Sequence, residues 1–456
     1  MGLFLQGLIG LLALTVGYVI YEKFNNVPEV PSFPDTWWGK GDPSKEETAI
    51  KPFKIDVSKE ILDDLKYRLD NAIPLQPSLE GVQQNYGINS KLLQTVIDYW
   101  KKDYNWTERQ KFLNKFPQYT VSVQGLKIHY IHVKPKLSPQ SKVKVLPLLL
   151  LHGWPGSVRE FYDIIPLLTE PQKGRNIVFE VIVPHLPGYG FSEATSKPGL
   201  SVVRISQIMK NLMHRIGFKK FYVQGGDWGS AVVMFMSILY PEVLLGAHSN
   251  SCFCMMQSCQ LKMFLLGSTF PSLIANKEEI PFFTPILDKM VFSTLLESGY
   301  MHIQSTKPDT VGTALRDSPV GLAAYLVEKF TSWTNPAWRD LEDGGLTKRY
   351  TYENILDNVM IYWVTRSITT SQRIYAETFN KAVMGSGILE IPSTVPTACA
   401  VFKNDLLSYP SSLLKKQFTN LVKARYYTDG GHFAAFEVPD VLAEDVYDFI
   451  EQVEIL

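Results

Sequence analysis

The chain has 456 residues, 45% of them hydrophobic and 20% charged, so it can bury a large core. Its 45 basic and 45 acidic residues give a formal net charge of zero, and the absence of a basic stripe excludes nucleic acid as an expected partner. The four cysteines show no CxxC or zinc-ligand spacing, which predicts buried free thiols and no metal site.

The first element is a long apolar stretch. Leu3–Tyr21 carries no charge and is long enough to cross a bilayer core of about 30 Å. No basic residue precedes it and no clean cleavage site follows, so residues 1–21 are predicted to be a transmembrane anchor, with a buried helix or an uncleaved signal as alternatives. Lysines after the span favour a cytosolic position for the rest, where the sequon Asn105-Trp106-Thr107 would stay unmodified.

Residues 22–115 are predicted to form an N-terminal accessory arm. The segment begins polar and then shows a helical period over Ser58–Leu69, with Ser58 as a plausible N-cap. A further helix is expected over Leu92–Lys111. Because the arm shows few strand patterns, it is not predicted to be a separate domain.

Residues 116–240 alternate between strand and helix patterns. The segment opens with a hairpin that turns at Gln124-Gly125. The later apolar runs are nearly continuous, which is typical of parallel strands that are covered on both faces. The expected elements are strands at 143–151, 178–183 and 221–223 and a helix at 201–216. This alternation predicts the first part of a doubly wound α/β sheet.

Strand signals fade between residues 241 and 380, where the chain is apolar, aromatic and interrupted by prolines. This segment is predicted to be a helical cap inserted over the sheet. Strand patterns return at Thr397–Phe402 and Ala424–Tyr427, so residues 381–456 are assigned to the second part of the core.

The most informative motif is Gly225-Gly226-Asp227-Trp228-Gly229, directly after the strand at 221–223. It has the form of a nucleophile elbow, with Asp227 where a hydrolase usually has serine. A carboxylate acylates poorly but displaces a leaving group from an sp³ carbon, which gives an alkyl ester that water hydrolyses. A helix-capping aspartate is the alternative interpretation.

A second motif, His152-Gly153-Trp154-Pro155-Gly156-Ser157, follows the strand at 143–151. Its spacing to the elbow predicts an oxyanion hole made by the backbone N–H groups of Trp154 and Trp228. A simple Gly/Pro turn is the alternative. His152 itself is predicted to be a structural residue.

The general base is predicted from its position late in the chain. His432 lies in a Gly-rich loop after the last strand, in the order nucleophile, acid, histidine of an α/β-hydrolase. Asp405, which follows the strand at 397–402, is predicted to orient it, with Asp429 as the rival. Opening an epoxide also needs an acid, for which tyrosine is suited, but the pattern does not choose among 22 tyrosines.

Several motifs in one order resemble the microsomal epoxide hydrolase family. They are the HGWPGS and GGDWGS motifs, Glu297–Gln304 (ESGYMHIQ), Lys307–Gly312 (KPDTVG), Asp317–Tyr325 (DSPVGLAAY) and Gly430–Glu437 (GGHFAAFE). The resemblance covers essentially the whole chain. It implies Asp227 as nucleophile, His432 as base, and Tyr300 and Tyr375 as the two acids from the cap. It also implies an α/β-hydrolase fold, attachment to the endoplasmic reticulum with a cytosolic catalytic domain, and no cofactor.

One position departs from the mammalian pattern of this family. Asp405 stands where a glutamate is expected, and its side chain is shorter by one methylene. The departure suggests a non-mammalian member. Because insect juvenile hormone epoxide hydrolases are similar to this family, juvenile hormone is a candidate substrate beside other lipophilic epoxides.

Two alternatives remain at this level. A haloalkane dehalogenase also uses an elbow aspartate, with Trp154 and Trp228 as candidate halide ligands, but needs no tyrosine acid. A non-catalytic carrier of hydrophobic ligands is the second. Apolar cap residues such as Phe282, Phe283, Phe292 and Trp333 suit a lipophilic ligand, or are simply core.

Overall fold

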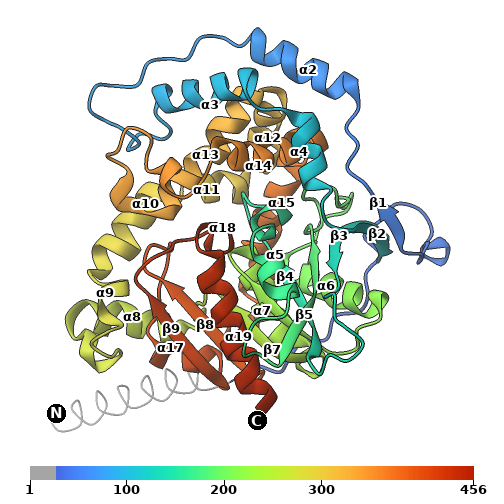
Figure 1. Ribbon diagram of the computed structural model, residues 1–456. Helices are drawn as coiled ribbons and strands as arrows, with labels where there is room; N and C mark the ends of the chain where they lie inside the picture. Colours follow the sequence, from blue (N-terminus) through green and yellow to red (C-terminus); the bar gives the residue numbers. More distant parts are fainter. Residues whose placement is uncertain (1–26, 456) are drawn as a thin grey trace, which may run out of the picture.

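The computed structural model describes residues 27–455 and contains one nine-stranded mixed sheet (Figure 1). The strand order is β1-β2-β3-β5-β4-β6-β7-β8-β9. The strands are β1 (Lys51–Phe53), β2 (Gln118–Val123), β3 (Leu126–Val133), β4 (Lys144–Leu151), β5 (Ile177–Pro184), β6 (Phe221–Gly225), β7 (Leu244–Ser249), β8 (Thr397–Phe402) and β9 (Leu421–Tyr427).

The sheet changes from antiparallel to parallel at β5. Strands β1, β2 and β3 pair antiparallel, and β3 also pairs antiparallel with β5. From β5 through β9 every pairing is parallel. The predicted hairpin is confirmed, because Gln124 and Gly125 between β2 and β3 both have positive φ, at 51° and 82°.

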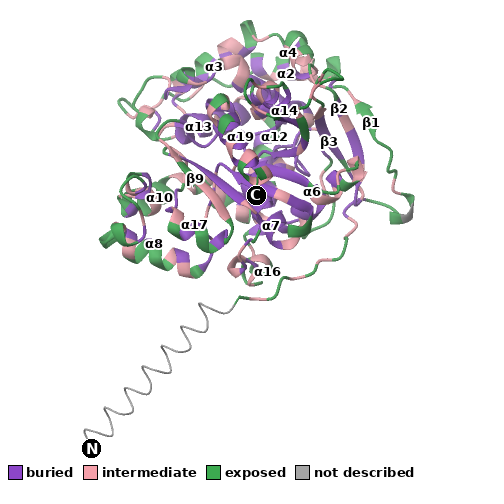
Figure 2. Ribbon diagram, turned by 60° about the horizontal axis from the view of Figure 1, so that its bottom comes forward, coloured by how far each residue is buried: buried purple, intermediate pink, exposed green. Residues whose placement is uncertain are grey.

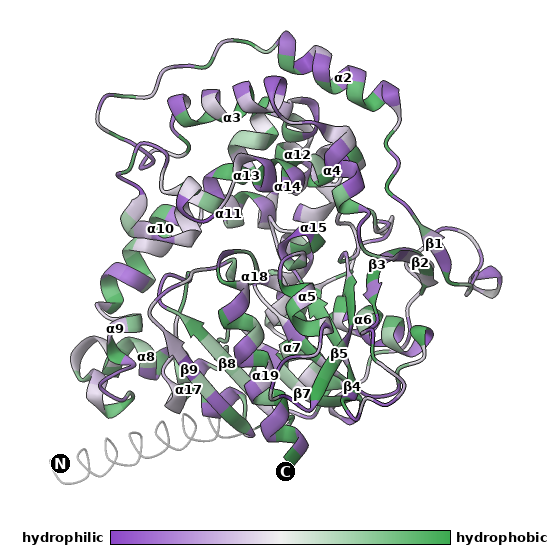
Figure 3. Cartoon of the chain, viewed as in Figure 1, coloured by the Kyte–Doolittle hydropathy of each residue, from purple (hydrophilic) through white to green (hydrophobic). Residues whose placement is uncertain are grey.

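Helices cover both faces of the parallel part, which explains why its strands are apolar along their length (Figure 3). Helix α7 packs on β4, β6 and β7 and against α6, while α19 packs on β7 and β8 and against α5. The bounds are α5 (Ile164–Thr169), α6 (Val202–Ile216), α7 (Trp228–Leu239), α17 (Ser411–Gln417), α18 (Ala434–Glu437) and α19 (Pro439–Ile455). The α/β-hydrolase fold expected from the sequence is therefore confirmed.

The segment between β7 and β8 is helical. Helices α11, α12, α13 and α14 lie above the sheet in Figure 1, while α8, α9 and α10 form one flank of the molecule. They are α8 (Gln257–Thr269), α9 (Ile280–Phe283), α10 (Ser293–Glu297), α11 (Gly299–Thr306), α12 (Pro308–Asp317), α13 (Pro319–Thr334), α14 (Tyr352–Thr365), α15 (Ile368–Thr378) and α16 (Lys381–Met384). A π-helical turn, η5 (Leu287–Phe292), precedes α10.

The N-terminal region holds α2 (Lys59–Asp70), α3 (Ser90–Lys102) and α4 (Trp106–Leu113) besides β1. The helix expected over Leu92–Lys111 is present, but as two helices, α3 and α4. The chain breaks between α3 and α4, and the Asn105 side chain caps α4 by accepting a hydrogen bond from the N–H of Glu108. The predicted anchor over residues 1–21 lies outside the described residues, and between residues 27 and 455 no helix is long and apolar enough to cross a membrane.

The cysteines are paired, which corrects the prediction of free thiols. Cys252, after β7, is bonded to Cys399 in β8, and Cys254 is bonded to Cys259 at the start of α8. The first bond joins residues 147 positions apart, so the spacing of the cysteines in the sequence could not predict it. Strands β7 and β8 are neighbours only in the folded sheet.

Candidate active site

Asp227 lies on a strained turn between β6 and α7. Its φ of 49° and ψ of −126° are unusual for a residue with a Cβ. Glycines on both sides allow the turn to approach neighbouring backbone. A Cβ at Gly225 would lie 2.5 Å from the carbonyl carbon of Gly229, and one at Gly229 would lie 2.0 Å from the oxygen of Leu151. The elbow predicted from the sequence is therefore built as expected.

The loop after β4 meets the Asp227 carboxylate from one side. The backbone N–H of Trp154 donates a hydrogen bond of 2.8 Å to Asp227 Oδ1. A side chain at Gly153 would collide with this oxygen, since a Cβ there would lie 2.1 Å away. Trp228 is the first residue of α7, so its N–H is one of the donors that a helix leaves unpaired in its first turn.

His432 meets the carboxylate from another side. Its Nε2 is 3.2 Å from Asp227 Oδ2, and its Nδ1 is 2.6 Å from Asp405 Oδ1. Asp405 is held in turn by the Ser251 hydroxyl, which donates to its Oδ2 at 2.8 Å, and by the N–H of Leu406. The rival acid Asp429 is exposed and forms an ion pair with Arg349 instead. The structure thus brings together Asp227, His432 and Asp405.

The two carboxylates control the charge of His432. Burial alone would lower the pKa of this imidazole, but the charges of Asp405 and Asp227 and their hydrogen bonds raise it well above its ordinary value. The two carboxylates therefore favour the protonated form of the ring. If the charge of Asp227 were removed, for example by forming an ester, the pKa of His432 would fall, and the ring could release its proton and then act as a base.

Tyr300 of α11 and Tyr375 of α15 both pack against Trp154, whose backbone N–H is bonded to Asp227. The Tyr300 ring stacks on the Trp154 indole at 5.3 Å between centroids, and Tyr375 meets the same indole edge-on at 6.1 Å. Tyr375 also packs against Trp228, and its buried hydroxyl has no hydrogen-bond partner in the part of the chain that the structure describes. Burial, and then the neighbouring Asp227 charge, raises the pKa of Tyr300. Both phenols therefore keep their protons at neutral pH, because burial raises the pKa of Tyr375 as well.

Two further carboxyl groups beside His432 were missed at the sequence level. Burial raises the pKa of Glu437, the last residue of α18, and that of Glu160 to about 8 each. Glu437 accepts a hydrogen bond from the N–H of Phe433 through Oε1, while its buried Oε2 has no hydrogen-bond partner among residues 27–455. Glu437 belongs to the GGHFAAFE motif, so its nearness to His432 in sequence was the available signal.

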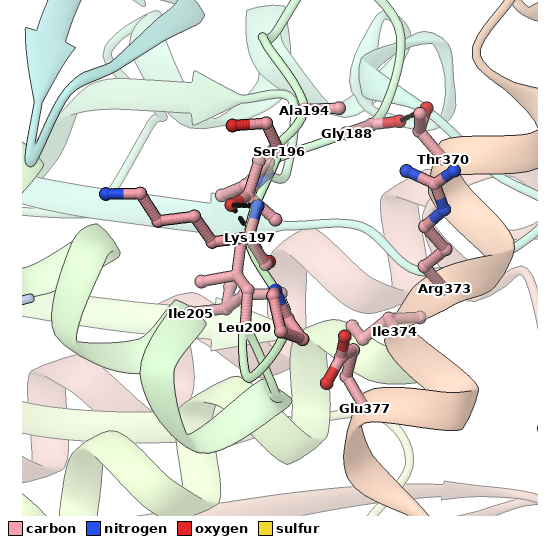
Figure 4. Close-up of a pocket in the computed structure, with 13 residues that line it drawn as sticks. Gly188, Ala194, Ser196, Lys197, Leu200, Ile205, Thr370, Arg373, Ile374 and Glu377 are labelled. Atoms are coloured by element: carbon pink, nitrogen blue, oxygen red, sulfur yellow. Dashed lines mark hydrogen bonds between the residues drawn. The ribbon is translucent and has the colours of Figure 1, made fainter. Parts of the chain in front are cut away.

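A pocket of about 280 Å³ lies elsewhere on α15 (Figure 4). Its wall includes Pro187, Leu200 and the α15 residues Arg373, Ile374 and Glu377, but none of the five predicted catalytic residues. Successive residues of a helix point about 100° apart, so Ile374 and Tyr375 face different directions. This pocket therefore lies on another face of α15 from the candidate site.

Comparison with known proteins agrees with this geometry. The family "Epoxide hydrolase N terminus" matches residues 50–161, and "alpha/beta hydrolase fold" matches residues 147–392. "Juvenile hormone epoxide hydrolase 1" of Ctenocephalides felis is 47% identical over 95% of this chain and 93% of its own length. "Epoxide hydrolase 1" of Oryctolagus cuniculus is 43% identical over 97% of this chain and 98% of its own length.

The fold comparison leads to the same group. The crystal structure of juvenile hormone epoxide hydrolase from the silkworm Bombyx mori matches with a TM-score of 0.89 and 46% sequence identity, covering 92% of this chain and 98% of the silkworm chain. The similarity spans the elbow, the helices with both tyrosines and the His432 loop. The chain therefore belongs to the epoxide hydrolase family of the α/β-hydrolase fold, and it is an epoxide hydrolase.

Proposed function

We propose that this enzyme opens lipophilic epoxides through an ester on Asp227. The observation that carries the proposal is the position of the Asp227 carboxylate, 2.8 Å from the N–H of Trp154 and 3.2 Å from His432 Nε2. In this position one oxygen of the carboxylate can attack the substrate. The N–H of Trp154 can stabilise the negative charge that develops later, and His432 can act as the base that activates water.

In the first step Asp227 Oδ2 attacks a ring carbon of the epoxide. The new C–O bond forms as the ring C–O bond breaks, and the departing oxygen takes a proton from Tyr300 or Tyr375. The raised pKa of both phenols supports this role, because they enter the step protonated. Oδ1 stays as the ester carbonyl oxygen, still bonded to the N–H of Trp154.

In the second step water attacks the ester carbonyl carbon. Once the ester has removed the Asp227 charge, His432 releases its proton through solvent to the tyrosinate. The neutral ring then accepts a proton from this water, and Asp405 stabilises the imidazolium that results. The negative charge on Oδ1 is held by the N–H groups of Trp154 and Trp228. As the ester C–O bond breaks, the second proton of the water goes to the departing alkoxide and the diol leaves. Asp227 keeps one oxygen of the water, and His432 is protonated as it was at the start.

We further propose juvenile hormone, an insect epoxide, as a substrate. This proposal is supported by 47% identity to a flea protein named for that activity and by a site walled with buried aromatic rings, including Trp154, Trp333 and Tyr375. Turnover of juvenile hormone at a kcat/KM no better than that of unrelated lipophilic epoxides would contradict it.

We also propose attachment to the endoplasmic reticulum through residues 1–21. The motifs that resemble the microsomal epoxide hydrolase family and the apolar composition of Leu3–Tyr21 support attachment. Disulfides persist mainly in oxidising compartments, so the two pairs bear on which side of the membrane the catalytic part lies. Glycan analysis at the exposed Asn105 separates the two sides: a glycan would place the catalytic part in the lumen, and an unmodified Asn105 would support the cytosolic side predicted from the sequence.

The ester is tested by a single turnover in H₂¹⁸O with an excess of enzyme over a lipophilic epoxide. We expect ¹⁸O in the Asp227 peptide and ordinary oxygen in the diol. Label in the diol alone would mean direct attack of water on the ring and would contradict the mechanism. Turnover of haloalkanes without that of epoxides would favour the dehalogenase alternative.

A further inference from the structure

One flank of the molecule exposes an unusual number of large apolar side chains. Ten of them, with exposed fractions between 37% and 76%, fall between residues 261 and 296, on α8, η4 (Pro271–Leu273), η5, α10 and the residues between. They are Leu261, Phe264, Leu265, Phe270, Leu273, Leu287, Val291, Phe292, Leu295 and Leu296. Figure 2 shows α8 and α10 on the same side of the molecule with much of their surface exposed. Contiguous apolar surface of this kind marks a contact with a partner or a membrane.

The spacing of these residues gives each helix an outward apolar face. On α8, Leu261, Phe264 and Leu265 share one face, while Cys259 and Met263 are buried on the inner side. A helix that is apolar on both sides is normally covered on both sides. Along η5 and α10, residues 291–296 are all exposed, so Val291, Phe292, Leu295 and Leu296 all lie at the surface.

Lysines lie at the edge of this apolar flank. Lys262 of α8 and Lys416 of α17 are both exposed and adjacent, and after burial the charge of Lys416 is the largest cause that lowers the pKa of Lys262. Within residues 257–297 the exposed lysines Lys262 and Lys277 are matched by the exposed acids Glu278 and Asp288, so the excess of positive charge beside the flank comes from Lys415 and Lys416 of α17. Two adjacent ammonium groups beside apolar surface match an anionic headgroup layer, which supplies counter-charges.

The chain enters the described structure on the same side. Pro28 lies against Gly387, where an added Cβ would be 3.3 Å from the proline Cγ. Three residues later, the Glu390 carboxylate accepts a hydrogen bond of 2.9 Å from the N–H of Gln257, the first residue of α8. An anchor formed by residues 1–21 would therefore hold the start of α8 close to the bilayer.

We propose that the apolar flank, residues 257–297, lies in the headgroup region of a bilayer that contains anionic lipid. The proposal rests on the membrane attachment proposed above and adds a second contact. The flank also adjoins the candidate site in sequence, because α10 ends three residues before Tyr300, and an ion pair of 2.8 Å between Glu297 and Arg339 fixes that junction.

The full chain, reconstituted into phosphatidylcholine/phosphatidylserine vesicles that carry a photoactivatable phospholipid, tests the proposal. After flotation and irradiation, labelled peptides are mapped by mass spectrometry. We expect labelling of peptides from 257–297 at least about fivefold above peptides from the loop that joins α2 and α3, whose Ile73 and Leu79 are also exposed apolar residues.

Variants link the labelling to function. Leu295→Glu with Leu296→Glu should lower flank labelling about fivefold and raise KM for a bilayer-dissolved epoxide, while kcat/KM for water-soluble glycidol stays unchanged. The matched control, Ile73→Glu with Leu79→Glu, should change none of these values. Unchanged turnover of glycidol also shows that each variant is folded.

The outcomes separate this proposal from the anchor. Flotation with no flank labelling overturns the flank contact alone, and no flotation overturns both. Flank peptides cross-linked to a second copy instead of lipid would also overturn it and identify a dimer interface. Flank labelling with residues 1–21 unlabelled supports the flank and contradicts the anchor.

Discussion

The sheet and the inserted helices contribute to the site in different ways. Asp227, Asp405 and His432 follow β6, β8 and β9, and parallel pairing of neighbouring strands brings these three loops to one edge. Tyr300 and Tyr375 come from α11 and α15, which no strand register positions. The comparison teaches that the sheet positions the proposed nucleophile and base as one unit, while the position of the two proposed acids depends on how a separate helical layer packs on the sheet.

The largest effect is expected at the nucleophile. Asp227→Ala should lower kcat about 10⁵-fold, because no ester can form without the carboxylate. Diol formation is measured by chromatography. The control is Asp429→Ala, which removes an exposed carboxylate three residues before His432 and should leave turnover nearly unchanged.

His432, the second group that the sheet positions, should act in the later step, the hydrolysis of the ester. His432→Gln should lower steady-state turnover about 10⁴-fold while the first ring opening still occurs. Rapid quench should then give one equivalent of product-derived ester on Asp227 and no further diol. If the ester burst were lost as well, His432 would also be needed in the first step. The proposed division of roles between the sheet and the helical layer would then be wrong.

The helical layer is tested by its hydroxyl groups. Tyr300→Phe with Tyr375→Phe should lower the rate of ester formation about 10³-fold, because the departing oxygen has no proton donor. Tyr325→Phe is a matched control, since that ring also packs against Trp154, at 5.6 Å. If the rate of ester formation were unchanged in the double variant, Tyr300 and Tyr375 would not be the acids.

A smaller effect is expected at the orienting acid. Asp405→Asn should slow ester hydrolysis about 10²-fold and leave ester formation nearly unchanged, because it weakens the support of the His432 imidazolium. Asp405→Glu restores the charge but must fit an extra methylene between Ser251 and His432. We expect it to lie between the parent and Asp405→Asn in single-turnover rates.

The smallest effect concerns stability and pH. In the folded protein the pKa of Glu437 is about 8, above its ordinary value of 4.5, so between these pH values the native carboxyl keeps a proton that the unfolded chain releases. Stability should therefore fall as pH rises from about 4.5 to 8. Glu437→Gln should flatten this slope in urea unfolding monitored at pH 5 and pH 8, and an unchanged slope would contradict the buried acid.

Much of the fold was predictable because it depends on local pattern. Continuous apolar runs ending in Gly-rich loops identified β4 and β6, and the Gln124-Gly125 turn identified the hairpin. The break between α3 and α4 was not predicted, since a capping Asn105 outweighed the apolar period. The domain boundaries at residues 115, 240 and 380 remain predictions.

By itself the sequence determined the elbow with Asp227, the order nucleophile, acid, histidine, and through its motifs the family. These features are short-range or depend on chain order. Only the tertiary structure decided that Asp405 and not Asp429 reaches His432, that Cys252 pairs with Cys399, and that Glu437 stays protonated. Each of these depends on which residues from separate strands come into contact and on how far those residues are buried from water. Neither property can be predicted from the local spacing of residues.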